Sequence, residues 1–250
     1  MTVQSMRPQL TEADIVRLMK GETSEERAGV AHRLCRRIAI DALSDDERQY
    51  ADEIIQILAQ DAAELVRRTL SVTLRNSPKL PREVALKLAE DVESVALPVL
   101  ENSPVFSDED LRELVLSVTA AKQSAIASRS KVSSALSETI SEHAAETGVE
   151  TLAGNPGADL SDKAYEIQLS RFPKNATLHE RIVLRDHVPV HIAEKMVSLV
   201  SGSVFDMLIN RHELPAQMAI DLAAGSRERA TIDLVEQAGR ANDLPRFVSQ

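Results

Sequence analysis

The chain has 250 residues, of which 43% are hydrophobic and 27% are charged, and its formal net charge at pH 7 is −10. A hydrophobic fraction of this size can bury a core, so the composition excludes a chain that is disordered throughout. The acidic balance disfavours a nucleic-acid-binding protein, which normally presents a basic face. Aromatic residues make up only 2% of the chain, which disfavours base stacking as well. We therefore expect no nucleic acid partner.

No window of the sequence approaches the roughly 18–20 apolar residues that are needed to cross a bilayer. The first residues also lack the apolar segment of a secretory signal peptide. The sequence therefore predicts a cytoplasmic protein without membrane insertion.

The single cysteine, Cys35, excludes a disulfide framework and a zinc site built from several cysteines. It lies in the segment Ala31–Arg37, close to three arginines. Two interpretations stay open. Cys35 is either a small hydrophobic residue on a helix, or a reactive thiolate that is stabilised by Arg33, Arg36 and Arg37.

Helix signals dominate the first 76 residues. Thr11 and Ser44 precede acidic residues and then apolar residues at helical spacing, as is typical of helix N-caps, and the segment Thr23-Ser24-Glu25-Glu26 opens a helix between them. A fourth helix is predicted over about residues 62–76. Because no segment alternates apolar and polar residues as a half-buried strand does, the fold class is predicted to be all-α. We expect residues 1–76 to form an N-terminal helical segment that packs on the repeats after it.

From residue 77 the sequence is periodic. The pattern Leu80-Pro81-x-x-Val84-Ala85 recurs from Val188 and again from Leu214. First helices of successive hairpins are predicted to start at 81, 107, 133, 161, 189 and 215, with Pro as the first helical residue or Ser as the cap. A period of about 26–28 residues accommodates two short helices and two turns. Residues 77–243 are therefore predicted to be helical hairpins that stack as a HEAT-like α-solenoid.

Asn76, Asn102 and Asn210 share one position of the repeat, where the second helix is expected to end. Asparagine tolerates the left-handed conformation of a helix stop, so we interpret all three as caps. A ladder of asparagine side chains that holds a bound peptide is the alternative.

Residues 244–250 are predicted to begin a further repeat, because Leu244-Pro245 repeats Leu214-Pro215 after 30 residues. This unit is unfinished at Gln250. Either the chain is a fragment of a longer protein, or its last helix packs on another molecule, which would allow self-association.

Residues that could carry chemistry are scattered. His187 and His191 have a spacing that can bind zinc, but Pro189 lies between them and no Cys or Glu-x-x-His accompanies them. Acidic groups such as Asp108–Asp110 lie in expected first turns of helices, where they stabilise the helix dipole. Phosphate loops and nucleophile motifs are absent from the sequence. We therefore predict no catalytic residue, metal or cofactor.

Basic residues form the remaining candidate site. Arginines that cluster could bind an acidic partner or a phosphate, but the default interpretation is that they are ordinary solvated side chains. The candidates for ligand or partner binding are Arg67, Arg68, Arg75, Arg227 and Arg229.

One stretch resembles a known bacterial family. The pattern Leu70-Ser71-x-x-Leu74-Arg75-x-Ser77-Pro78-x-Leu80-Pro81, continued through Val84-Ala85, Leu88-Ala89 and Asp91 to Pro98-Val99-Leu100 and Ser103-Pro104, is similar to domain of unknown function 2336, found mainly in alphaproteobacteria. The similarity extends over most of the chain and is strongest from about 65 to 115. It implies helical repeats and a bacterial cytosolic setting, and it implies no activity.

These observations support three functional hypotheses. The first is a non-enzymatic scaffold or adaptor that binds another protein, in bacterial signalling or cell organisation, because helical stacks present extended surfaces. The second is a receptor for a phosphorylated or nucleotide ligand that is read by arginines such as Arg75. The third, DNA binding, is disfavoured by charge and composition.

Overall fold

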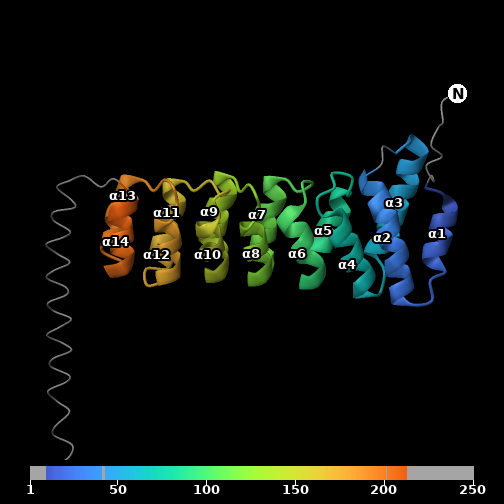
Figure 1. Ribbon diagram of the computed structural model, residues 1–250, viewed down its shortest axis with the longest axis horizontal. Coiled ribbons are helices and arrows are strands. Elements are labelled where there is room, and N and C mark those ends of the chain that lie inside the picture. Colours follow the sequence, from blue (N-terminus) through green and yellow to red (C-terminus); the bar gives the residue numbers. More distant parts are fainter. Residues whose placement is uncertain (1–9, 41–42, 201, 213–250) are drawn as a thin grey trace, which may run out of the picture. The chain divides into compact units, whose positions relative to one another are not determined.

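The computed structural model describes residues 10–40, 43–200 and 202–212, and every helix or strand assigned in these ranges is an α-helix (Figure 1). The all-α prediction is confirmed, and sequential helices pack on one another as in an α-solenoid-like repeat. The first seven helices are α1 (Glu12–Met19), α2 (Ser24–Ile40), α3 (Asp45–Ala59), α4 (Glu64–Leu74), α5 (Arg82–Glu90), α6 (Glu93–Asn102) and α7 (Asp108–Ser117). The next seven are α8 (Ala120–Ala127), α9 (Ser134–His143), α10 (Glu146–Gly154), α11 (Asp162–Arg171), α12 (Ala176–Val183), α13 (Val190–Val197) and α14 (Gly202–Arg211).

The predicted starts of the first helices agree with the structure to within one residue. Ser107 and Ser133 are the N-caps of α7 and α9, and each side-chain oxygen accepts a hydrogen bond from the third residue of its helix. Helix α11 starts directly after residue 161. The start predicted at 215 lies outside the described residues.

Pro81 and Pro189 occupy the N-cap and not the first helical position that the sequence predicted. Their φ values of −59° and −57° are those of any proline, but their ψ values of 135° and 141° are extended. The carbonyl of Pro81 still accepts the first helical hydrogen bond, from Ala85 N at 3.0 Å. The extended ψ therefore moves each helix start by one residue.

The left-handed conformation predicted for the asparagines is wrong for Asn76 and Asn102, because no non-glycine residue in the described ranges has a positive φ. Both residues do lie where a helix ends. Asn102 stabilises the end of α6 differently: its amide donates to the carbonyl of Pro98 at 3.0 Å. Asn210 lies one residue before the end of α14.

The chain divides into two compact units, residues 1–167 and 168–250. In the first unit the helical hairpins follow one another in chain order, and they form two rows (Figure 1). Second helices pack on second helices (α2 on α4, α4 on α6, α6 on α8, α8 on α10), and first helices likewise contact first helices. In the second unit α12 packs on α14. The boundaries predicted at residues 76 and 243 stay predictions.

Aliphatic side chains form the core of each hairpin. Ile54, Leu70 and Leu88 are completely buried, and so are small residues such as Ala85 and Ala89, which let neighbouring helices approach closely. None of the helices in the described ranges combines the length with the apolar character that a membrane crossing requires.

Candidate functional site

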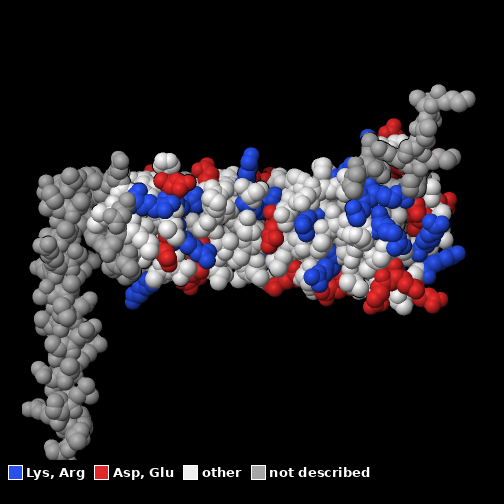
Figure 2. All heavy atoms as spheres, viewed as in Figure 1, with Lys and Arg blue, Asp and Glu red and all other residues white. Residues whose placement is uncertain are grey.

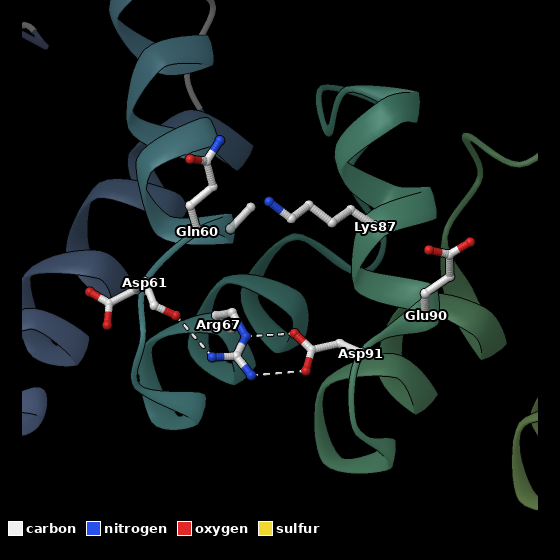
Figure 3. Close-up of a pocket in the computed structure, with 7 residues that line it drawn as sticks. Gln60, Asp61, Arg67, Lys87, Glu90 and Asp91 are labelled. Carbon is white, nitrogen blue, oxygen red and sulfur yellow. Dashed lines mark hydrogen bonds and ion pairs between the residues drawn. The ribbon is translucent and has the colours of Figure 1, made fainter.

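An open groove of about 460 Å³ lies beside Arg67, where the α3–α4 turn faces the α5–α6 turn (Figure 3). Arg67 donates to Asp91 with Nε at 2.5 Å from Oδ2 and Nη2 at 2.9 Å from Oδ1. Its third nitrogen, Nη1, donates to the carbonyl oxygens of Asp61 at 2.9 Å and Ala62 at 3.3 Å. All three nitrogens are therefore engaged within the chain, and Arg67 joins two hairpins. Lys87 and Gln60 also line the groove, together with Ala59 and Glu90.

The same kind of contact recurs between other hairpins of the first unit. Arg27, Arg67 and Gln123 are each the fourth residue of a second helix and reach the turn of the following hairpin. Arg27 forms a bidentate pair with Asp61 at 2.8 and 2.9 Å. Gln123 accepts from Ala145 N at 2.8 Å. We call these contacts the turn latches. Each of the three fixes one hairpin to the hairpin that follows it.

A second row of polar contacts joins the first helices. Arg82 of α5 forms a bidentate pair with Asp110 of α7, in which Nε lies 2.9 Å from Oδ2 and Nη2 contacts Oδ1. Arg112 of α7 donates to Thr139 Oγ1 of α9 at 2.9 Å. Asp110 is also the first-turn acid that the sequence predicted, and it accepts from Ser107 N at 2.9 Å. Its pairing with Arg82 was missed, because 28 residues separate the two in the sequence.

These pairs should make the fold sensitive to acid. Hydrogen bonds from arginine lower the pKa of Asp61, Asp91 and Asp110, that of Asp110 to about 2. A depressed pKa means that the folded chain binds the proton more weakly than the unfolded chain, so the stabilisation is complete above about pH 4 and is lost towards about pH 2. We expect the melting temperature to fall over this interval. In the Asp110→Asn variant the melting temperature should be lower than that of the wild type at neutral pH and should fall less steeply with acid, as calorimetry at several pH values would show. An unchanged slope would contradict this account.

A third set of contacts satisfies the last carbonyls of second helices. Lys79 Nζ donates to the carbonyl of Ile38 at 2.7 Å. Arg129 donates to the carbonyls of Leu100 and Ser103 at 2.6 and 2.7 Å, and its burial lowers the pKa of its guanidinium. Asn155 donates to the carbonyls of Ala127 and Arg129 at 2.7 and 2.8 Å. In the second unit, His212 Nε2 lies 2.9 Å from the carbonyl oxygen of Val183.

Two stretches without any acidic residue lie side by side on the first unit. Residues 27–40 and 65–82 contain no Asp or Glu, although the whole chain has 39. They form most of α2 and α4, which pack on each other. His32 Nδ1 lies 3.4 Å from Thr73 Oγ1, so the C-terminal part of α4 runs beside the middle of α2. The tertiary structure therefore joins two basic stretches into one surface.

The arginines of these stretches on α2 and α4 divide into two groups. Those that face a neighbouring helix or turn have carboxylate partners: Arg27 with Asp61, Arg37 with Asp14, and Arg67 with Asp91. Those that face solvent have no carboxylate partner among the residues that the structure describes: Arg33, Arg36, Arg68 and Arg75. We call these four residues the arginine surface.

Exposed apolar side chains accompany the arginines on α4. Leu65, Arg68, Val72 and Arg75 follow at intervals of three, four and three residues, which places them on one helix face. Leu65 is 42% exposed and Val72 is 40% exposed. The φ and ψ of the C-cap Arg75 are helical, so this residue continues the face. We call these four residues the α4 stripe.

The surface view shows how charge is distributed over one face of the first unit. Basic side chains gather over α1 and α2, and acidic side chains lie along the lower edge of the same end of the first unit (Figure 2). The structure thus brings Arg68 and Arg75 onto one helix face and assigns Arg67 to a turn latch. Arg227 and Arg229 lie outside the described residues.

Cys35 is completely buried, and burial raises the pKa of its thiol to about 12. The structure therefore favours a small hydrophobic residue over a reactive thiolate, since a nucleophilic cysteine needs a lowered pKa and exposure. We expect no labelling of the folded protein by iodoacetamide at pH 8 and complete labelling in denaturant, as mass spectrometry would show. Labelling of the folded chain at the rate of a free thiol would contradict the burial.

His187 and His191 are both exposed, the first before α13 and the second within it. In the part of the chain that the structure describes, no group of three or more His, Cys, Asp or Glu side chains is placed to hold a metal ion.

Comparison with known protein families finds a match for part of the chain. Residues 95–250, more than half of the chain, match the family described as uncharacterised protein conserved in bacteria, DUF2336. No curated protein and no solved structure matches the chain. The match starts in α6, so the arginine surface precedes it. Because the matched region covers more than half of the chain, the chain belongs to the bacterial DUF2336 family.

Proposed function

We propose that this protein is a non-enzymatic adaptor in the bacterial cytoplasm that binds another protein through the outward faces of α2 and α4. The observation that carries the proposal is the arginine surface. Its four exposed guanidinium groups have no carboxylate partner among the described residues, in a chain of net charge −10. Local positive charge on an acidic protein steers an acidic partner to one place and excludes basic ones. Leu65 and Val72 add apolar area beside the charges.

The contacts between hairpins support the same proposal. The turn latches and the carbonyl contacts of Lys79, Arg129 and Asn155 fix neighbouring helices at defined positions. A preorganised surface loses less conformational entropy on binding than a flexible one. Stacked helical repeats commonly serve as such surfaces, and signalling or cell organisation is the setting that we propose.

Affinity purification from the source bacterium tests this function. Three tagged forms are compared by quantitative mass spectrometry: the wild type, a variant with Arg33, Arg36, Arg68 and Arg75 changed to Gln, and a control with the exposed Lys131 and Lys174 changed to Gln. We expect at least one protein that the wild type and the control enrich equally and that the arginine variant enriches about tenfold less. Equal enrichment by all three forms, or no enriched protein, would overturn the proposal.

A second candidate function is a receptor for a phosphorylated or nucleotide ligand. The same arginine surface favours it, because guanidinium groups bind phosphate oxygens in bidentate geometry and no carboxylate within the described ranges pairs with these four arginines. Thermal-shift measurements against a nucleotide panel distinguish the two functions. Stabilisation that the Gln variant abolishes would support the receptor, and no shift with any compound would exclude it for that panel.

A further inference from the structure

We infer that the partner element bound by this surface is an acidic amphipathic α-helix that lies along α4. The inference rests on the proposed function and adds the chemistry and the shape of the partner. It starts from the α4 stripe, in which apolar and basic side chains alternate along one helix face.

The spacing of the residues in the α4 stripe suits a partner that is itself a helix. Leu65 and Val72 are seven residues apart, and so are Arg68 and Arg75. Seven residues correspond to about two turns and roughly 10.5 Å along the axis. A second helix that runs beside α4 offers its own residues at the same interval, so that one apolar and one acidic contact repeat in register. An irregular segment has no such repeat.

Thr73 of α4 lies beside His32 of α2, and residues 65–82 contain no acid. Thr69 and Thr73 donate their hydroxyls to the carbonyls of Leu65 and Thr69, at 2.7 and 2.6 Å. Their donors are therefore used within α4, and a partner helix need not satisfy them. Beyond them lie Arg33 and Arg36 of α2, one and four residues after His32, which contacts Thr73.

The charges require an acidic partner. Within 65–82 the residues Arg68 and Arg75 meet no Asp or Glu of their own stretch, and Glu64, the one acid four residues from Arg68, accepts a hydrogen bond from Ser94 at 2.5 Å. Carboxylates are the groups on a protein that guanidinium binds with bidentate geometry. A helix with carboxylates on both sides of an apolar line would reach Arg68 and Arg75 on one side and Arg33 and Arg36 on the other.

Site-specific photo-crosslinking in the source bacterium tests this inference. The photoreactive residue p-benzoylphenylalanine replaces Val72 in the full chain, and a second form carries it at Leu116 of α7, which is 61% exposed and far from α4 in the sequence. Adducts are mapped by mass spectrometry. From position 72 we expect an adduct with one protein segment that is rich in Asp and Glu and has apolar residues at helical spacing. The same adduct should not form from position 116.

Charge reversal provides the matched control. Arg68→Glu with Arg75→Glu should reduce the adduct at least about tenfold, whereas Lys131→Glu with Lys174→Glu, which changes the net charge equally, should leave it unchanged. All four side chains are exposed, so circular dichroism should show melting temperatures within a few degrees of the parent. If the charge-reversed chain unfolds, Arg68→Gln with Arg75→Gln replaces it.

The outcomes separate the two proposals. An adduct from position 72 with a basic segment, with lipid or with nucleic acid, or one that charge reversal leaves intact, overturns the acidic helix. If position 72 gives an adduct with a protein segment that is not helical, binding through α2 and α4 stands and the acidic helix falls. If protein adducts form only from position 116, a partner binds elsewhere on the chain and both proposals fall. If neither position gives a protein adduct, both proposals fall.

Discussion

Changing Gly157 to alanine should destabilise the first unit by about 3 kcal/mol, since a rigid contact must open and its hydrogen bonds must weaken. A Cβ at this position would lie 2.2 Å from the carbonyl oxygen of Ser130 and 2.8 Å from its carbonyl carbon. Both atoms belong to the backbone, so no side chain can move aside. The loops are also tied together, by Val132 N to Gly157 O at 3.0 Å and Asp159 N to Val132 O at 2.9 Å.

Chemical denaturation followed by circular dichroism measures this effect. The matched control is Gly29→Ala in α2, where the nearest atom to a new Cβ is a terminal nitrogen of Arg33 at 3.8 Å. That substitution should be neutral or stabilising, because alanine favours the helix over glycine by up to about 1 kcal/mol. If Gly157→Ala is as stable as the wild type, the close approach of the two loops is wrong.

The substitution Arg129→Met should cost about 2–4 kcal/mol, because it leaves two carbonyls without their charged donor. Methionine retains much of the side-chain volume but cannot donate to Leu100 O and Ser103 O, which Arg129 contacts at 2.6 and 2.7 Å. Leu100 and Ser103 are completely buried residues, so water has poor access to this helix end. Arg129→Lys should recover part of the lost stability, because its single ammonium group can still donate to a carbonyl but lacks the two separate nitrogens of the guanidinium.

Denaturant titration of both variants checks this prediction. The exposed Arg68→Met serves as the control for loss of a guanidinium without a structural contact, and it should change stability by less than about 0.5 kcal/mol. If Arg129→Met and Arg68→Met are equally stable, the carbonyl contacts do not hold the hairpins together.

Local chemistry explains which parts of the fold were predictable. Pro81, Ser107, Ser133 and Pro189 start helices because they fix φ or satisfy free N–H groups, and those effects act within a few residues. For Asn76 and Asn102 the sequence predicted the right place, the end of a helix, but the wrong backbone conformation. Asn102 uses its amide as a donor, and sequence spacing does not distinguish a side-chain donor from a left-handed backbone.

By itself the sequence determined the all-α class, the helix starts and the repeat, because capping and apolar periodicity act locally. Only the tertiary structure decided which arginines are free. Arg67 and Arg68 are neighbours in the sequence and were equal candidates, but about 100° separates them around the helix axis. That rotation directs Arg67 to Asp91 of the next hairpin and leaves Arg68 in solvent beside Val72. The pairing of distant residues, which no local pattern encodes, therefore made one arginine structural and left the other available to a partner.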